Sequence, residues 1–287
     1  MDSEILRHKT ETLNRIVEKL GTIPLDYREK FEFIREKRVS DKKWLAAGVL
    51  VPLLCRESSR DPRNVEFVFQ LIKRSDGVPQ GGDLSAPGGM LNPSVDGIIR
   101  YFIHAGLPPV MADNARQLLS KRDRHTVRYA ALFLANALRE SWEELRLSPF
   151  NVSFLGALPS YSLTIFTRTI FPVVGLVKRP WRFRPNWEVE KVVEIPLASF
   201  FQPENYAFYT IESADDSHGN TPDNHWTMPC LIQRDTDGND EILWGATFNI
   251  IMSFLKAVFD IEPPEIDPRK NISRKLDRNY LTGNRKI

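Results

Sequence analysis

The chain has 287 residues, of which 42% are hydrophobic and 26% charged, and its formal net charge is +2. This composition is globular and excludes a disordered chain, while the balanced charge excludes a surface dominated by nucleic-acid binding. The charged N-terminus lacks the apolar core of a signal peptide, and the most apolar late segment, 247–259, is too short to span a bilayer. We therefore expect a cytoplasmic protein without membrane contact.

The first half of the chain changes from helical to strand-like and back to helical patterning. Apolar residues have helical spacing at 3–20, and Gly21 is a plausible end of this helix. A second, weaker helical pattern covers 26–38. Two β-like apolar runs follow, at 46–54 and 65–74. A glycine-rich loop then covers 76–91, and glycines permit close approach of the backbone to a ligand. Residues 94 to 147 are mostly helical in pattern.

The second half returns to strands and closes with a helix. Strands are expected at 152–161, 164–177, 188–197, 228–234 and 240–245. The sequence Asp-Thr-Asp-Gly at 235–238 is a hairpin signal between the last two. The final helix is expected at 246–259, and the following segment has many basic residues and is expected to be a surface arm or a flexible tail.

Three carboxylates lie together on the predicted helix that ends near residue 147. Glu140, Glu143 and Glu144 have the spacing i, i+3, i+4 and so share one helix face, where like charges repel. A divalent cation with a preference for oxygen ligands, such as Mg²⁺ or Mn²⁺, would remove this repulsion. The alternative is an acidic, solvated helix face with no ligand.

The order of motifs around these glutamates resembles that of the Nudix hydrolase family. Pro87-Gly88-Gly89 is followed by Arg139-Glu140-Ser141-Trp142-Glu143-Glu144, and the family box runs G-x5-E-x7-R-E-U-x-E-E-x-G-U, where U is a bulky aliphatic residue. The segments 155–161, 169–177 and 186–197, with Trp244-Gly245-Ala246-Thr247, look like the downstream part of the coenzyme A diphosphatase branch. The resemblance covers about residues 44–259.

The resemblance implies an α/β fold, the Nudix-type α/β/α sandwich with a mixed sheet, extended by N-terminal helices and a helical insertion. The expected organisation is an N-terminal helical extension at 1–40, a Nudix hydrolase domain at 41–260 and a basic C-terminal tail at 261–287. The box is split by the insertion, at about 93–128.

The resemblance also implies hydrolysis of a diphosphate bond with Mg²⁺ or Mn²⁺ as cofactor, on a nucleoside diphosphate linked to another moiety such as coenzyme A. The expected metal ligands are Glu140, Glu143, Glu144, Gly89 and Asp96, the last as a replacement for the early box acid. The expected catalytic residues are Arg139, Glu143 and, as alternative general bases on one side of a strand, Glu188 and Glu190. The expected substrate contacts are Gly88, Gly89, Arg182 and Trp187.

Departures from the box leave a second interpretation open. Ser141 stands at the U position, Arg146 replaces the late glycine, and Ala131 occupies the place of the early glutamate. The alternative is therefore a Nudix-fold module that binds a nucleotide or a protein without turnover. Binding of nucleic acid through the basic tail is a weaker interpretation. The expected partner is a small-molecule nucleotide diphosphate, and the extra N-terminal helices and the tail suit a homodimer contact.

Overall fold

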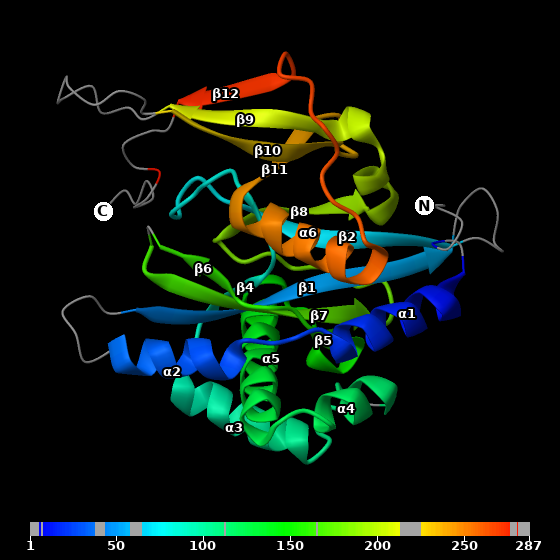
Figure 1. Cartoon of the computed structure of the whole chain (residues 1–287), viewed down its shortest axis with the longest axis vertical. Coiled ribbons are helices and arrows are strands. Elements are labelled where there is room, and N and C mark those ends of the chain that lie inside the picture. The colour runs from blue at the N-terminus through cyan, green and yellow to red at the C-terminus, as the bar shows by residue number, and fades with distance from the viewer. Residues whose placement is uncertain are drawn as a thin grey trace.

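The computed structural model describes residues 6, 8–37, 44–57, 65–111, 113–164, 166–212, 225–275 and 280. Within these ranges the protein is a mixed α/β fold with two sheets, which confirms the predicted fold class (Figure 1). The N-terminal helices and the helices between the glycine loop and the glutamates are present as expected. His218 and the tail residue Arg278 lie outside the described residues.

The larger sheet has eight strands and is mixed because β1 runs parallel to β7 and antiparallel to β2 and β4. Its path is β3-β2-β1-β7-β5, while β4 pairs with β1, β6 with β7, and β8 with β2. The strands are β1 Leu45–Glu57, β2 Val65–Arg74, β3 Leu84–Ser85, β4 Gly88–Met90, β5 Val152–Ala157, β6 Tyr161–Leu163, β7 Arg168–Val177 and β8 Val189–Pro196.

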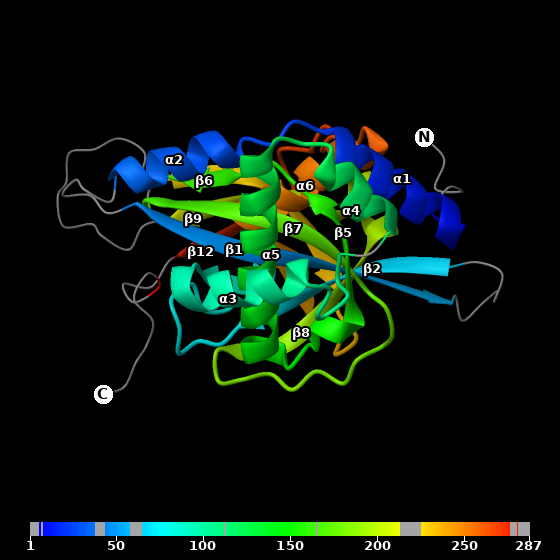
Figure 2. The same ribbon diagram turned by 90° about the horizontal axis from the view of Figure 1, so that it is seen from below.

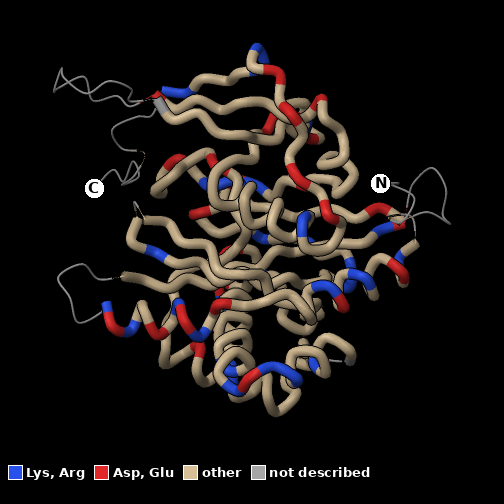
Figure 3. The backbone as a smooth tube through the Cα atoms, viewed as in Figure 1, with Lys and Arg blue, Asp and Glu red and all other residues tan. Residues whose placement is uncertain are grey.

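Helices cover both faces of this sheet because its central strands are apolar on both sides. One face packs against α5 (Arg124–Leu145), together with α2 (Tyr27–Lys37) and α3 (Pro93–His104). The other face packs against α6 (Gly245–Phe259) and α1 (Lys9–Thr22). Figure 2 shows α5 crossing the strands, with the short helix α4 (Asp113–Ser120) nearby. In Figure 3 the centre of the molecule is almost free of charged residues.

A second, four-stranded sheet lies beyond α6, with the order β11-β10-β9-β12 (Figure 1). Its strands are β9 Tyr206–Glu212, β10 His225–Arg234, β11 Asp240–Leu243 and β12 Asn271–Lys275. The predicted hairpin is confirmed, since β10 pairs antiparallel with β11 and Gly238 has a φ of 84° in the turn between them. Three short 3₁₀ helices cover Pro149–Asn151, Leu197–Phe201 and Pro203–Asn205.

Two local expectations are corrected. Gly21 is not a helix stop, because α1 continues to Thr22 and Gly21 packs so closely on Leu118 that a Cβ atom there would lie 2.5 Å from its side chain. Part of the basic tail is a strand, since β12 pairs in parallel with β9. The local sequence of 271–275 does not indicate a strand, and its pairing with β9, about 60 residues earlier in the chain, gives it this conformation. No helix in the described ranges is long and apolar enough to cross a membrane.

Tyr27 shows that the N-terminal helices belong to the same core as the sheet. Its ring is fully buried, packs edge-on against Phe133 and Phe171, and its hydroxyl donates to the carbonyl of Pro172 at 2.8 Å. Removing the ring leaves a cavity, while removing only the hydroxyl deletes one of the two hydrogen bonds that the Pro172 carbonyl accepts, the other coming from the Leu158 N–H at 3.0 Å.

We therefore expect Tyr27→Ala to lower the free energy of unfolding by about 3–5 kcal/mol and Tyr27→Phe by about 1 kcal/mol, measured by urea denaturation. Tyr101, which is 70% exposed, provides the control. Tyr101→Ala should change the free energy by less than about 0.5 kcal/mol. An equally small effect of Tyr27→Ala would show that α2 is not part of the cooperative core.

Candidate functional site

Helix α5 carries the glutamates, and both of its ends are fixed by local interactions. Asp123 caps the N-terminus, because its carboxylate accepts from the backbone N–H groups of His125 and Thr126 at 3.0 Å each. At the C-terminus Arg146 adopts a left-handed conformation with φ of 57°, and its N–H donates to the carbonyl of Trp142 at 2.9 Å. Arg146, which stands where the expected motif has a glycine, thus adopts a left-handed conformation that glycine reaches most easily.

A segment after β7, residues 178–188, satisfies carbonyl groups of the last turn of α5. The Trp181 indole N–H donates to Arg146 at 2.8 Å, the Arg184 backbone N–H to Leu145 at 3.0 Å, and the Asn186 backbone N–H to Glu144 at 2.8 Å. These bonds hold the end of the helix against the loop. Two expected substrate contacts, Arg182 and Trp187, belong to this segment and are exposed, Trp187 by 61%.

Asn136 joins α5 to two strands one turn before the glutamates. Its side-chain oxygen accepts from the Gly48 N–H on β1 at 2.6 Å, and its amide nitrogen donates to the Met90 carbonyl on β4 at 3.2 Å. The side chain is fully buried. A Cβ atom at Gly48 would lie 2.5 Å from the Asn136 oxygen, so only glycine permits this approach. Sequence reasoning missed Asn136, although a polar residue on an apolar helix face is a usable signal.

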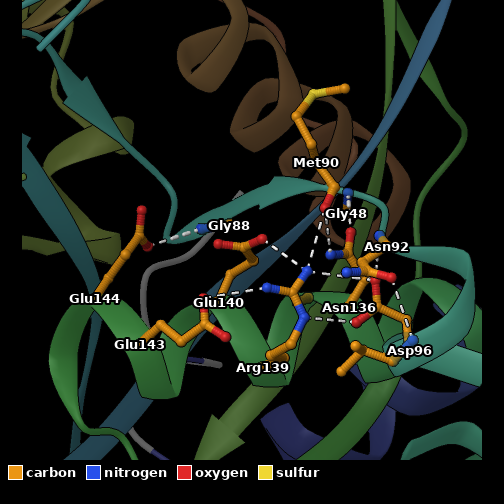
Figure 4. A network of polar contacts seen from close by, with 12 residues as sticks. Gly48, Gly88, Met90, Asn92, Asp96, Asn136, Arg139, Glu140, Glu143 and Glu144 are labelled. Atoms are coloured by element: carbon orange, nitrogen blue, oxygen red, sulfur yellow. Dashed lines mark hydrogen bonds and ion pairs between the residues drawn. The ribbon is translucent and has the colours of Figure 1, made fainter. Parts of the chain in front are cut away.

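Arg139 connects the glycine loop, α3 and α5 through its guanidinium group (Figure 4). It donates to the Met90 carbonyl at 3.2 Å and to Asp96 at 2.7 Å, and forms ion pairs with Glu140 at 2.8 Å and Glu143 at 3.1 Å. Burial lowers the pKa of Arg139, but the hydrogen bond to Asp96 and the charge of Glu140 outweigh it, so the net shift is upward. The positive charge is therefore permanent.

Asp96, expected as a metal ligand, has both of its carboxylate oxygens in hydrogen bonds with the protein. The residue is fully buried on α3; one carboxylate oxygen accepts from Arg139, and the other accepts from the Asn92 N–H at 2.7 Å. Both oxygens are thus committed to hydrogen bonds. The structure instead gives Asp96 the position of an acid that orients the arginine, across the residues that split the motif.

Glu140 and Glu144 point from α5 toward the glycine loop, as Figure 4 shows. A Glu144 oxygen accepts from the Gly88 N–H at 3.0 Å, and the carboxylate of Glu140 lies below Gly89. A Cβ atom at Gly89 would stand 2.6 Å from the Glu140 carboxyl carbon, so the loop can approach the carboxylate only with glycine there. At Gly88 a Cβ atom would lie 2.4 Å from the Gly48 carbonyl oxygen.

The two carboxylates resist ionisation because they are withdrawn from water. Glu144 is 4% exposed, and burial raises its pKa to about 8; the Gly88 N–H opposes the shift, and the charges of Glu140 and Glu188 add to it. Burial also raises the pKa of Glu140, although Arg139 acts in the opposite direction. A cation near both carboxylates would reverse these shifts, so the donor set fits a divalent ion that prefers oxygen ligands.

Glu143 lies at the solvent edge and is held by Arg139 rather than by the loop. Its side chain is 52% exposed, and such exposed ion pairs contribute about 0–1 kcal/mol, so its carboxylate is only weakly held by Arg139.

A second acidic cluster is formed by Asp235, Asp237 and Glu241. Among the described residues, these three each place a carboxylate oxygen within 4.8 Å of the other two, and the three glutamates of α5 do not. Lys191 already occupies that second cluster, with contacts to Asp235 at 2.7 Å and Glu241 at 2.9 Å, and offsets part of its negative charge.

The two expected general bases have different surroundings. Glu188 is half-buried, and its charge contributes to the raised pKa of Glu144 after the larger effect of burial. Glu190 is exposed and forms an ion pair with Lys73 at 3.5 Å. A β-bulge separates them, because the register changes from Lys73↔Lys191 to Arg74↔Val189. Simple strand alternation, which predicted that both point to the same side, therefore fails at this position.

Ser141, which stands in place of an aliphatic residue, is accommodated inside the helix packing. It is fully buried, and its hydroxyl donates to the Ala137 carbonyl four residues earlier at 2.7 Å. Ala131 is likewise fully buried within α5, so it faces the core and not the loop. These departures change the back of the helix and leave the glutamate face in place.

Asp83 joins the glycine loop to the C-terminal arm, a connection that the sequence did not predict. Its buried carboxylate accepts from Arg274 at 3.0 Å, from the Trp244 indole at 3.3 Å and from the Tyr280 hydroxyl. The Gln80 N–H in the same loop donates to the Tyr280 carbonyl at 2.6 Å. Arg274, expected in a solvated tail, therefore holds the loop that leads to Gly88 and Gly89.

Comparison with known proteins agrees with the motif order. A segment of 86 residues, 30% of the chain, is 37% identical to an uncharacterized Nudix hydrolase, NudL, of Pectobacterium atrosepticum and covers 44% of it. A 91-residue segment is 38% identical to the NudL protein of Salmonella paratyphi B and covers 46% of it. The similarity supports a place in the Nudix hydrolase family. The chain spans less than half the length of these curated relatives, and no family model matches it.

Solved structures show a more distant likeness. A MutT/nudix family protein from Enterococcus faecalis is 15% identical with a TM-score of 0.39, over 82% of this chain and 73% of that one. An Ap4A hydrolase from C. elegans is 14% identical with a TM-score of 0.32, over 54% of this chain and 81% of that one. These scores are too low to carry an argument about the site.

The raised pKa of Glu144 predicts how stability depends on pH in the presence of a chelator. The native carboxyl titrates near 8 and the unfolded one near 4.5, so the native state binds more protons between these values. The free energy of unfolding therefore falls as the pH rises through this range. Glu144→Gln removes the titration and keeps an oxygen for Gly88, so the variant should gain on wild type as the pH rises, measured by urea denaturation. Parallel curves for the two proteins would contradict the shift.

The contact between the C-terminal arm and the loop predicts a local effect on dynamics. Arg274→Ala removes the ion pair to Asp83, so the backbone amides of residues 80–83 should exchange hydrogen several-fold faster. Arg269→Ala is the matched control, because Arg269 is 89% exposed and pairs only locally with Asp267. Equal exchange in the two variants would show that the arm does not hold the loop.

Proposed function

We propose that the protein is a Nudix-type hydrolase that cleaves a diphosphate bond with the help of Mg²⁺ or Mn²⁺. The observation that carries this proposal is the packing of Glu140 and Glu144 against Gly89 and Gly88, which leaves two crowded carboxylates facing a loop that has no side chains at the point of contact. Two carboxylates buried side by side are costly to ionise together unless a cation lies near both, and Arg139 pairs with Glu140 and Glu143. The similarity to NudL proteins supports the same reaction class.

In this proposal Glu140 and Glu144 hold the metal, Glu143 supplies a further oxygen from the solvent edge, and the backbone carbonyl of Gly89 is a fourth ligand. A divalent ion held there supplies positive charge to phosphoryl oxygens and favours ionisation of a water molecule. Arg139 holds Glu140 and Glu143 in place and is itself held by Asp96. Asp96 is thus proposed as a positioning residue.

The proposed general base is Glu188, and Glu190 is not favoured. The Asn186 N–H bond to the Glu144 carbonyl at 2.8 Å keeps the residues before β8 close to the end of α5. Glu188 is two residues away and half-buried, which suits a carboxylate that accepts a proton. The ion pair of Glu190 with Lys73 ties it instead to the contacts between the two sheets.

The proposed substrate is a nucleoside diphosphate linked to another moiety, with coenzyme A-like compounds favoured by the resemblance of the downstream strands. Gly88 and Gly89 would approach the phosphates through their backbone, and the exposed Trp187 and Arg182 could stack on a base and contact phosphate. Both lie on the segment, residues 178–188, that is bonded to the end of α5.

The experiment is a product assay with Mg²⁺ or Mn²⁺ and a panel of coenzyme A, ADP-ribose, NADH and dinucleoside polyphosphates. We expect at least one substrate to be split, and Glu140→Gln, Glu144→Gln and Glu188→Gln to lower kcat/KM by about a hundredfold or more. Glu262→Gln is the matched control, since Glu262 is exposed and pairs only with Lys256, so its kcat/KM should equal that of wild type.

The alternative is a Nudix-fold module that binds a nucleotide without turnover. The ion pairs of Arg139 with Glu140 and Glu143 favour it, because they compete with a metal for the same oxygens. Absence of turnover on every compound, with a thermal stabilisation by nucleotide that Glu144→Gln leaves unchanged, would support the module and contradict the hydrolase.

A further inference from the structure

A cavity of about 360 Å³ lies between α2, α3 and α5, and none of the three glutamates lines it. Its lining residues come from these three helices, and Figure 2 shows α3 lying across α5. α3 contributes Pro93, Gly97 and Arg100, a face next to the one that carries Asp96. The volume falls within the range of about 300–1,000 Å³ that is usual for small-molecule sites.

Three arginines line this cavity, and no acidic side chain does so among the described residues. They are Arg35 on α2, Arg100 on α3 and Arg128 on α5. The Arg100 Nε atom is buried and has no hydrogen-bond partner in the part of the chain that the structure describes. Burial lowers the pKa of Arg100, and the positive charge of Arg128 lowers it further. A buried donor without a partner and two mutually repelling cations are both destabilising, and an anion would relieve both effects.

The rest of the wall is apolar and partly aromatic. Phe31 and Ile34 on α2 face Tyr129 and Leu132 on α5, and the rings of Phe31 and Tyr129 are 4.6 Å apart. At Gly97 a Cβ atom would meet nothing within 4 Å, so the space above this glycine is open. The cavity therefore offers cationic donors beside a surface on which a flat ring can pack.

We propose that this cavity binds a small phosphate monoester that carries an aromatic or heterocyclic ring. Guanidinium groups match the oxygens of a phosphate in pairs, and a dianion balances three arginines better than a single carboxylate does. The ring would pack on the apolar wall formed by α2 and α5. The proposal does not depend on the hydrolase activity, because no residue of the cavity belongs to the glutamate site.

The test is calorimetric titration of the full-length protein with adenosine monophosphate in the presence of a chelator. Wild type should bind it, while adenosine and inorganic phosphate alone should bind more weakly because each lacks one half of the recognised chemistry. Arg100→Gln and Arg128→Gln should each weaken the affinity by about tenfold or more. Arg124→Gln is the matched control, because Arg124 is exposed on the same helix and does not line the cavity.

A second pair of variants tests the cavity without any added ligand. Gly97→Glu introduces a carboxylate beside the arginines, and Gly97→Gln introduces a neutral group of the same size. The Glu variant should melt at a higher temperature than the Gln variant, and this difference should shrink when Arg100→Gln is added. Any one of three results would overturn the proposal. They are no detectable binding of adenosine monophosphate by wild type, an affinity that both arginine substitutions leave unchanged, and equal melting temperatures of the two Gly97 variants. Since no turnover is measured, none of these outcomes bears on the hydrolase.

Discussion

The guanidinium group of Arg139 is the interaction on which the arrangement of the site depends. It joins Asp96 on α3, the Met90 carbonyl on β4 and two glutamates on its own helix. Asp96 and Met90 precede Arg139 by 43 and 49 residues in the chain, and the ion pair with Asp96 is almost fully out of water. Loss of one partner from such a pair costs about 3–5 kcal/mol, because the other charge stays buried. Helix α3 is therefore coupled to the glutamate face through one side chain.

The second constraint is the absence of side chains where the loop meets the helix. Gly48, Gly88 and Gly89 each stand where a Cβ atom would collide with backbone or with a polar side chain of α5. This close approach buries Glu144 and gives its carboxylate the backbone N–H of Gly88. The burial raises the cost of ionising the glutamate, whereas the bond from the Gly88 N–H lowers it. In the proposed function, a bound divalent cation lowers this cost of ionisation.

The sequence was sufficient to predict features that depend on local patterns. The runs 46–54 and 65–74 became β1 and β2, and the spacing of the glutamates placed them on one helix because helical periodicity needs no tertiary information. Features that depend on distant partners were not predictable in the same way. The pairing of β12 with β9, the bond from Asn136 to Gly48 and the bulge before Lys191 each require contacts between segments far apart in the chain. The bond from Arg139 to Asp96 was likewise not predictable, since the spacing of the two residues does not reveal it.

The most direct test of the account is to locate the metal itself. A crystal grown with Mn²⁺ and a non-hydrolysable diphosphate should show an anomalous peak about 2.1–2.3 Å from carboxylate oxygens of Glu140 and Glu144, beside the Gly89 carbonyl. The account predicts that Asp96 keeps its bond to Arg139 in that structure. An anomalous peak confined to Asp235, Asp237 and Glu241, or no peak on α5 at saturating Mn²⁺, would contradict the proposed metal site.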